Sequence, residues 1–446
     1  MAAAVVRWLA RAICWIFYRV EQAGAVPPDG PVLILPNHPN ALLDPAVIWA
    51  TAGRDVRFLA KSTLFEGAFA PVLRLARAIP VYRRIDQGAD ASRNSETFAV
   101  VDAALAEGSA ICIFPEGVSH STGRLVSLRT GAARMALTAA RHGIAVQLVA
   151  AGLNFDRKTS FRSRAIVLYG RPFTLRDLAS STADDQTAVR LATEAIAAQM
   201  RRLLVEADPV ADEAMLTRVE RLYAAARGPA RSPEERVARR QAIAHGMERL
   251  RARDQPRFDD IARRLRRYDN RLQRFGLRDR HLDWDVSAGS AVPFALREGA
   301  LALLLGPLAA AAFVLFWVPY QVTGLLARLA TRERDVAATA KVFVGAAVYV
   351  AWLVVISAIA WWLGGVRTAL VAAAAVPLVA VAVLFCIERE TAVVETVQSW
   401  FMLRRANRLT RARLREARSE LASVLEETYE WLSAETRAPA DERMPN

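Results

Sequence analysis

Residues 31–35 (PVLIL) form an apolar run that leads directly into the polar segment 36–45 (PNHPNALLDP). An apolar run of this length between turn residues predicts a buried β-strand. His38 and Asp44 then lie in the segment that opens where the strand ends. Loops at strand ends commonly carry catalytic groups, so this segment is the first candidate for a functional site.

The same pattern continues along the chain. Four more apolar runs predict strands at 78–82, 110–114, 145–154 and 165–169. Helical periods lie between them, for example at 94–106 and 130–140. Strands that alternate with helices predict an α/β domain, here a mixed sheet flanked by helices.

The composition limits the function classes. The 446 residues carry a net charge of +14, which fits nucleic acid, an anionic membrane surface or an anionic substrate. The hydrophobic fraction of 53% is somewhat high for a soluble protein, and the excess lies between residues 299 and 387, which favours a membrane. The three cysteines form no CxxC motif or Cys/His cluster, so neither a disulfide framework nor a zinc site is expected.

Two parts of the chain, its first 20 residues and the region 299–387, carry membrane signals. Residues 1–20 are apolar with interspersed arginines, which predicts an amphipathic helix lying on a membrane rather than a signal peptide; an ordinary surface helix is the alternative. Uncharged runs at 299–320, 342–363 and 369–387 are each near the ~20 residues that cross a hydrocarbon core.

The charged parts of the chain favour one topology. The tail after residue 387 and the connector after the first run are basic, and positive residues concentrate on the cytoplasmic side. We therefore expect the run 299–320, which contains two prolines, to dip into the membrane and return. The other two runs would form a hairpin that turns at Gly364-Gly365. Three ordinary spans are the alternative, because proline is tolerated in membrane helices.

Two segments carry the chemistry. His38 and Asp44 are six residues apart, so they can meet only if the loop folds back; Asp44 would then orient the imidazole as a general base. Alternatively, Asp44-Pro45 only starts a helix, with Asp44 as its N-cap. The second segment, 114–123 (FPEGVSHSTG), also follows a strand, and its Pro-Glu-Gly predicts a sharp turn that places Glu116 at the end of the sheet.

Together these segments resemble the glycerolipid acyltransferase family, which contains lysophosphatidic acid and glycerol-3-phosphate acyltransferases. The resemblance covers about 26–173. Its four blocks occur in order, at 37–44, 79–83 (IPVYR), 114–117 (FPEG) and 146–154 (VQLVAAGLN), and 128–132 (LRTGA) is similar to a further family stretch.

This chain departs from the family pattern at three places. The spacing is His-x5-Asp instead of His-x4-Asp, which resembles a membrane subgroup of glycerol-3-phosphate and dihydroxyacetone-phosphate acyltransferases. Arg77 replaces the glycine that usually precedes the second block, and Ala150-Ala151 stands where the fourth block usually has a proline.

The resemblance implies roles for seven residues. His38 would be the catalytic base and Asp44 its orienting partner, while Arg83 would bind the acceptor phosphate. The remaining expected substrate-binding residues are Glu116, Gly117, Asn37 and Arg129, and His120 could also line the site. No metal or bound cofactor is implied, since the acyl donor, acyl-CoA or acyl-carrier protein, is a co-substrate.

The sequence therefore predicts five regions: an amphipathic helix (1–22), a catalytic domain (23–205), a charged helical region (206–295), membrane segments (296–390) and a basic helical tail (391–446). The expected partners are the acyl donor, a glycerophosphate-type acceptor and membrane lipids, without nucleic acid. The expected location is a membrane, the bacterial inner membrane, with the catalytic domain in the cytoplasm. The alternatives are another lyso-lipid acceptor or a non-catalytic membrane scaffold.

Overall fold

The computed structural model describes residues 2–66, 70–82, 94–181, 184–207, 210–277, 279, 282–283, 288–330, 337–405 and 408–437. The chain divides into two compact units. The first, here the catalytic unit, comprises Met1–Asp208, Ser232–Ala238 and Ala327–Phe343, and the second, the helical unit, comprises Pro209–Arg231, Arg239–Leu326 and Val344–Asn446.

A seven-stranded mixed sheet forms the centre of the catalytic unit, with the strand order β1-β7-β6-β2-β5-β3-β4. All paired strands are parallel except β6 and β7, which are antiparallel. The strands are β1 (Tyr18–Ala23), β2 (Val32–Pro36), β3 (Val56–Lys61), β4 (Ile79–Val81), β5 (Ala110–Cys112), β6 (Gln147–Phe155) and β7 (Ser163–Tyr169). The expected mixed α/β fold is confirmed.

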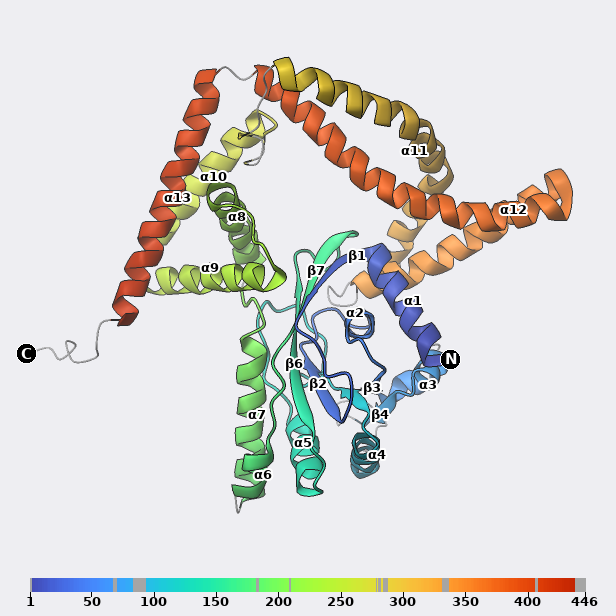
Figure 1. The fold of residues 1–446 in the computed structure, drawn as a ribbon, viewed down its shortest axis with the longest axis vertical. Coiled ribbons are helices and arrows are strands. Elements are labelled where there is room, and N and C mark those ends of the chain that lie inside the picture. The colour runs from blue at the N-terminus through green and yellow to red at the C-terminus, as the bar shows by residue number, and fades with distance from the viewer. Residues whose placement is uncertain are drawn as a thin grey trace, which may run out of the picture. The chain divides into compact units, whose positions relative to one another are not determined.

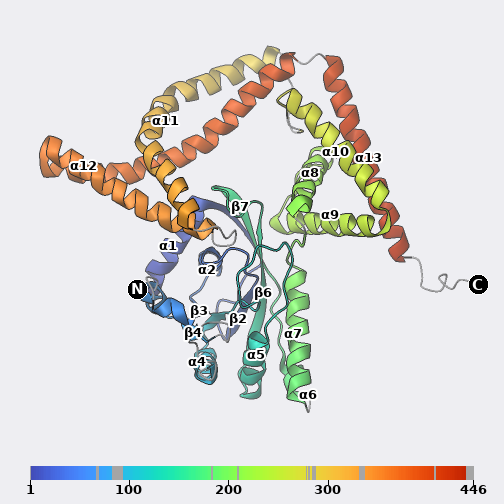
Figure 2. The same ribbon diagram turned by 180° about the vertical axis from the view of Figure 1, so that it is seen from behind.

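Helices cover both faces of this sheet (Figure 1; Figure 2). On one face lie α1 (Ala2–Phe17) and α2 (Leu43–Thr51), and on the other α4 (Asn94–Ala106), α5 (Gly131–Arg141) and α7 (Asp185–Arg201). Two short helices, α3 (Ala70–Leu75) and α6 (Arg176–Ser181), complete the unit. Alternate residues of β2 belong to opposite cores: Leu33 and Leu35 pack with α4, α5 and α7, and Val32 and Ile34 pack with α2.

Most predicted elements of the sheet are present, and two corrections are needed. All five predicted strands form, as do helices α4 and α5 close to their expected bounds. The amphipathic helix, however, ends at Phe17, and residues 18–23 form the edge strand β1. Strand β3 was not predicted, because its polar residues Arg57 and Lys61 interrupt the apolar pattern.

The helical unit has its own hydrophobic core. Four helices contribute to it: α8 (Val210–Arg227), α9 (Pro233–Arg253), α10 (Gln255–Arg274) and α13 (Arg408–Arg437). Leu222, Leu265 and Leu421 pack together there, so the charged region predicted at 206–295 and the predicted tail share one core. Helix α9 begins as its sequence predicts, since Ser232 Oγ accepts a hydrogen bond from the backbone N–H of Glu235 at 3.2 Å.

Two long apolar helices contain the predicted membrane runs. Helix α12 (Ala337–Arg405) is interrupted at Gly364 and Gly365, which have non-helical backbone angles, as the expected hairpin turn requires. Within the described residues, the stretch Thr339–Val381 is long and apolar enough to cross a membrane. Helix α11 (Ala288–Ala330) is one helix, so the expected reversal within 299–320 is wrong. Pro307 and Pro319 thus lie within a continuous helix, which tolerates a proline where neighbouring groups satisfy the freed backbone groups.

Candidate active site

The loop after β2 folds back and brings His38 to Asp44. His38 Nδ1 lies 2.8 Å from Asp44 Oδ2, and the same oxygen accepts a hydrogen bond from the backbone N–H of Asn40 at 2.7 Å. Ala41 makes the reversal possible by adopting a left-handed conformation with φ 45°. The loop thus folds back as the first alternative requires, and the two side chains meet despite the longer spacing; the role of His38 as a base stays a prediction.

Asp44 is fully buried in the first turn of α2. It does not cap that helix: the N-cap residue is Leu42, so the N-cap assignment is wrong, and the carboxylate instead faces the loop that precedes the helix. Burial raises the pKa of Asp44, while the hydrogen bond from His38 and the positive charge of Lys158 oppose that rise. Because Nδ1 of His38 donates to this carboxylate, Nε2 is the nitrogen that can accept a proton.

Glu116 holds His38 from the other side. β2 and β5 are adjacent and parallel, so the loops that follow them begin at the same edge of the sheet. Glu116 Oε2 accepts a hydrogen bond from the backbone N–H of His38 at 2.7 Å, and Oε1 lies 2.9 Å from Nε2 of His120. The backbone N–H of His120 in turn donates to the carbonyl of His38 at 3.1 Å. The loops that follow β2 and β5 are thus joined by hydrogen bonds to the backbone of His38.

The turn after β5 forms as its sequence predicts. Gly117 has φ +75°, and its N–H donates to the carbonyl of Phe114 at 3.1 Å. The ring of Phe114 stacks on the imidazole of His38 at a centroid distance of 4.0 Å, which limits rotation of the imidazole. Phe114 and Glu116 of this turn therefore hold the imidazole and the backbone of His38 in place.

Two family models match this chain. The model described as Acyltransferase matches residues 7–151, and the model described as glycerol-3-phosphate acyltransferase 2 C-terminal domain matches residues 215–436. The first match contains His38, Asp44 and Glu116 in the arrangement described above. Residues 7–151 therefore form an acyltransferase family domain.

Individual relatives match shorter stretches of this chain. Glycerol-3-phosphate O-acyltransferase 2 of Saccharomyces cerevisiae is 39% identical over 84 residues, which are 18% of this chain and 11% of that protein. Glycerol-3-phosphate O-acyltransferase 1 of the same yeast is 27% identical over 181 residues, 39% of this chain and 24% of that protein. The chain therefore matches about a tenth to a quarter of the length of these relatives.

Among solved structures, the 1-acyl-sn-glycerophosphate (LPA) acyltransferase PlsC from Thermotoga maritima aligns with 45% of this chain and 79% of its own, at 16% identity and a TM-score of 0.34.

The fourth block of the sequence, which lies in β6, holds the loop after β2 in place. The side chain of Asn37 forms two hydrogen bonds with the backbone of Leu153 in β6, donating to its carbonyl at 3.1 Å and accepting from its N–H at 2.7 Å. Both polar ends of Asn37 are thus used within the protein. Asn37, expected to bind substrate, anchors the histidine loop to the central strand in this structure.

Three residues that the sequence analysis did not single out complete the support. Asn40, fully buried, donates from Nδ2 to the hydroxyl of Tyr18 at 2.6 Å, and that hydroxyl donates to the carbonyl of Lys158. Lys158 Nζ donates to the carbonyl of Pro39 at 2.9 Å. Asn40 lies inside the catalytic block and could have been examined as a buried polar residue. Tyr18 and Lys158 come from distant segments and carry no local signal.

Of the two arginines expected to contact an anionic substrate, Arg129 lies beside the site and Arg83 lies outside the described residues. Arg129 is exposed and lies directly over Gly117, because a Cβ added to Gly117 would be 3.1 Å from Cγ of Arg129. Arg129 therefore borders the site, as expected of a residue that could contact an anionic substrate. Arg83 lies outside the described residues. Its block begins with β4, which is parallel to β3 and ends at Val81.

Proposed function

We propose that this protein transfers a fatty acyl chain from acyl-CoA or acyl-carrier protein to a hydroxyl of glycerol-3-phosphate or 1-acylglycerol-3-phosphate. The observation that carries the proposal is the distance of 2.8 Å between His38 Nδ1 and the buried carboxylate of Asp44. A buried carboxylate at this position fixes the tautomer in which Nε2 is unprotonated and stabilises the imidazolium that forms during reaction.

The reaction follows from this geometry. His38 Nε2 accepts the proton of the acceptor hydroxyl as the oxygen attacks the thioester carbonyl. The carbon–sulfur bond then breaks, the ester forms, and the imidazolium returns the proton to the departing thiolate. No redox step occurs, and the expectation that no metal or bound cofactor takes part remains a prediction.

Purified full-length protein, labelled acyl-CoA and a panel of acceptors test this function. The panel contains glycerol-3-phosphate, lysophosphatidic acid and lysophosphatidylcholine. His38→Ala should lower turnover by ~10²–10⁴-fold, the usual contribution of general acid–base catalysis. His142→Ala is the matched control, because His142 also contacts an aspartate, Asp102, but lies on the exposed end of α5.

The outcomes separate the alternatives. Turnover with the phosphate acceptors that disappears in His38→Ala and persists in His142→Ala supports the proposal. Turnover only with lysophosphatidylcholine would assign another lyso-lipid acceptor. Absence of acyl transfer by wild-type protein to every acceptor in the panel, from labelled acyl-CoA and from labelled acyl-carrier protein, would leave the non-catalytic scaffold as the function.

Arg83 is proposed to bind the acceptor phosphate, because a guanidinium can form two parallel hydrogen bonds with it. Arg83→Ala should raise the KM for a phosphate-bearing acceptor more than the KM for acyl-CoA, with a loss of ~1.5–3 kcal/mol in acceptor binding. Steady-state kinetics with each substrate varied in turn measures this. An equal rise of both KM values would contradict a contact that is selective for the acceptor.

The proposed location is a membrane, with the catalytic unit on the cytoplasmic side, where acyl donors are available. The apolar stretch Thr339–Val381 supports attachment to a membrane. The curated relatives are yeast proteins, so they give no support to the bacterial inner membrane, and the proposal does not extend to it.

A further inference from the structure

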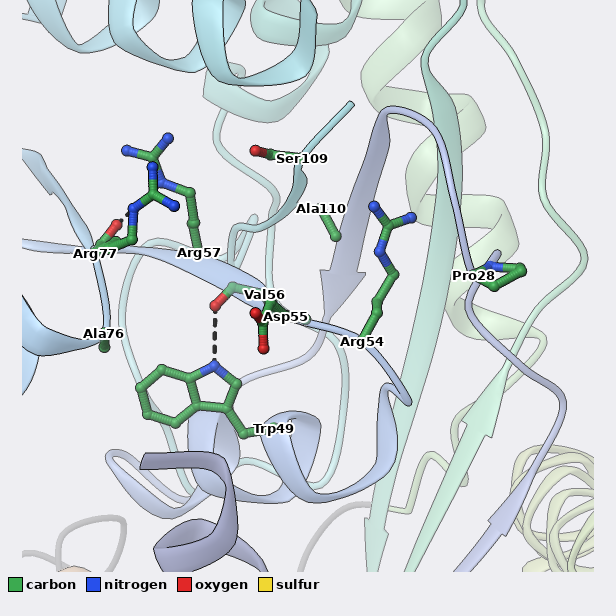
Figure 3. Close-up of a pocket in the computed structure, with 10 residues that line it drawn as sticks. All are labelled: Pro28, Trp49, Arg54, Asp55, Val56, Arg57, Ala76, Arg77, Ser109 and Ala110. Atoms are coloured by element: carbon green, nitrogen blue, oxygen red, sulfur yellow. Dashed lines mark hydrogen bonds between the residues drawn. The ribbon is translucent and has the colours of Figure 1, made fainter. Parts of the chain in front are cut away.

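A cavity of about 290 Å³ lies in the catalytic unit away from His38 (Figure 3). Its wall includes Val56 and Ala110, the first residues of β3 and β5. The catalytic loops follow the carboxyl ends of the parallel strands β2 and β5, whereas this cavity lies at the amino end of β5. The sheet therefore separates the cavity from the site of acyl transfer.

Arginine dominates the charge of the cavity wall, and one of the three arginines there has a structural role. The guanidinium of Arg54 donates hydrogen bonds to the carbonyls of Pro27, Gly30 and Gly108 at 2.8–3.0 Å. These bonds join the turns before β2 and β5, so Arg54 holds the cavity in shape. Arg57 and Arg77 supply the other two positive charges.

Arg57 and Arg77 are held against each other. Nε of Arg57 donates to the backbone carbonyl of Arg77 at 3.1 Å, and Figure 3 shows their two guanidinium groups side by side. Burial and the charge of Arg77 both lower the pKa of Arg57, and the opposing charge of Glu107 acts on it less strongly. The acidic residue of the wall, Asp55, forms an ion pair with Arg7 of α1 at 2.9 Å.

Arg77 also has an unfavourable backbone conformation. Its φ of 52° lies in the left-handed region, which costs an L-residue free energy that glycine does not lose. An arginine at this position places a second positive charge beside Arg57. Two adjacent guanidinium groups repel each other unless an anion lies between them.

We propose that this cavity binds a phosphate-bearing anion between Arg57 and Arg77, at a site distinct from the acyl-transfer centre. Guanidinium groups match the geometry of phosphate oxygens, and the hydroxyl of Ser109 in the wall adds a neutral donor. The volume is at the low end for small-molecule sites, so it fits a phosphate group with a small substituent.

Two sources could supply such a phosphate group. One is a soluble phosphate ester. The other is the headgroup of an anionic lipid, because Arg7 connects the cavity wall to α1, whose neighbouring residue Trp8 is 67% exposed. An exposed tryptophan on an amphipathic helix is typical of a membrane-facing surface.

The first experiment measures the unfolding temperature of full-length protein in detergent as a function of inorganic phosphate, with chloride at matched ionic strength as reference. The concentration dependence of the rise gives an apparent Kd. Arg77→Gly should raise this Kd by about tenfold or more, the usual effect of losing one hydrogen-bonded charge pair. This variant is suited to the test because glycine accepts the left-handed conformation.

Controls separate this site from others. Arg57→Gln should weaken phosphate binding in the same way, whereas Arg74→Gln, which removes an exposed charge from the neighbouring α3, should not. Arg83→Ala identifies any phosphate bound at the acyl-transfer centre, because the part of the stabilisation that is lost in this variant belongs to that centre and not to the cavity. An apparent Kd that is the same in Arg77→Gly, Arg57→Gln and wild-type protein would overturn the proposal.

The second experiment distinguishes the sources. Protein in phosphatidylcholine nanodiscs with and without phosphatidic acid is compared by the same measurement. Stabilisation by phosphatidic acid that is lost in Arg77→Gly identifies a lipid headgroup as the ligand. Stabilisation by inorganic phosphate alone, again lost in Arg77→Gly, identifies a soluble phosphate ester.

Discussion

At the scale of single residues, Asp44 combines two opposing properties. Its carboxylate orients His38, yet it lies fully buried, and one of its oxygens, Oδ1, has no hydrogen-bond partner within the described residues. A charge in such a position lowers the stability of the folded protein. The burial that lets Asp44 orient His38 therefore lowers the stability of the folded protein.

Asp44→Asn should lower turnover by ~10²–10⁴-fold while leaving the unfolding temperature at pH 7 unchanged or higher. The expected effect on the unfolding temperature follows from the linkage between proton binding and folding. Burial raises the pKa of Asp44 in the folded state above its unfolded value of ~3.9, so the folded state binds the proton more tightly. The contribution of Asp44 to the free energy of unfolding is then fully present below the unfolded pKa of its carboxyl group, and it is lost as the pH rises through the folded pKa.

Thermal unfolding between pH 4 and pH 8 measures this effect. The difference in unfolding temperature between Asp44→Asn and wild type should grow in favour of the variant as the pH rises. Asp102→Asn is the control, because Asp102 also contacts a histidine but at the surface. A large loss of stability in Asp44→Asn at pH 7 would show that the carboxylate stabilises the fold.

Ala41 gives the second prediction at this scale, because the whole His-x5-Asp loop depends on its left-handed backbone. Ala41→Gly should retain activity and change the free energy of unfolding by less than ~1 kcal/mol, since glycine adopts this conformation freely. Ala41→Val should be destabilised by at least ~1–2 kcal/mol and lose activity, because a β-branched residue fits it poorly. Denaturant unfolding gives the free energy of unfolding of both variants, and an activity assay gives their turnover. Equal stability and equal turnover of Ala41→Gly and Ala41→Val would contradict the role given to Ala41.

At the scale of elements, β6 connects the catalytic loop to the rest of its unit. Leu153 binds Asn37, and the next residue, Asn154, binds the backbone of residues 203–205: its Nδ2 donates to the carbonyl of Leu203 and its Oδ1 accepts from the N–H of Val205, both at 2.9 Å. Gly152 allows this close approach, since a Cβ there would lie 2.3 Å from the carbonyl oxygen of Leu203. The fourth block thus acts through backbone contacts.

Gly152→Ala should therefore lower the free energy of unfolding by ~1–3 kcal/mol, as overpacking does, and lower turnover by displacing Asn37. Gly131→Ala is the matched control. A Cβ at Gly131 would be 4.0 Å from the nearest atom, and alanine in the first turn of α5 should be neutral or stabilising. Normal stability and turnover in Gly152→Ala would show that β6 and residues 203–205 can separate without effect on the site.

At the scale of the whole molecule, the beginning of α12 belongs to the catalytic unit. Lys341 Nζ donates to the carbonyl of Thr159 at 2.8 Å, and Val342 packs against the cluster formed by Phe17 and Tyr18. At the proposed membrane, the start of α12 would therefore lie on the same side as the loop that carries His38. Trp361 and Trp362, both strongly exposed, precede the break at Gly364 and are suited to the opposite membrane surface.

This arrangement predicts that the two halves of α12 form a hairpin across the membrane. Because α13 follows that hairpin and shares one core with α8 and α10, both ends of the continuous helix α11 should lie on the same side, so that α11 does not cross. Single cysteines at positions 331, 368 and 419 are labelled in intact cells with a membrane-impermeant thiol reagent, after Cys14, Cys112 and Cys386 have been replaced. A cysteine at 368 should react, since it follows the turn, whereas those at 331 and 419 should react only after permeabilisation. Reaction at 331 from outside would show that α11 crosses.

The sequence by itself determined the strand that precedes the catalytic loop, the order of the four blocks and the break at Gly364-Gly365. These features depend on short apolar runs, turn residues and membrane-length segments, whose physical causes are local. Strands β1 and β3 were missed because their residues are half exposed, and their pairing with β7 and β5 depends on segments far away in the chain.

The tertiary structure alone decided how the active site is assembled. The adjacency of β2 and β5 brings Glu116 to the backbone of His38, and the fold brings Tyr18 and Lys158 to the loop that holds Asp44. Asp44 is a buried partner of His38 rather than a helix cap because Ala41 reverses the loop. These contacts join residues that are 22, 78 and 119 positions apart in the chain, and no local pattern in the sequence specifies them.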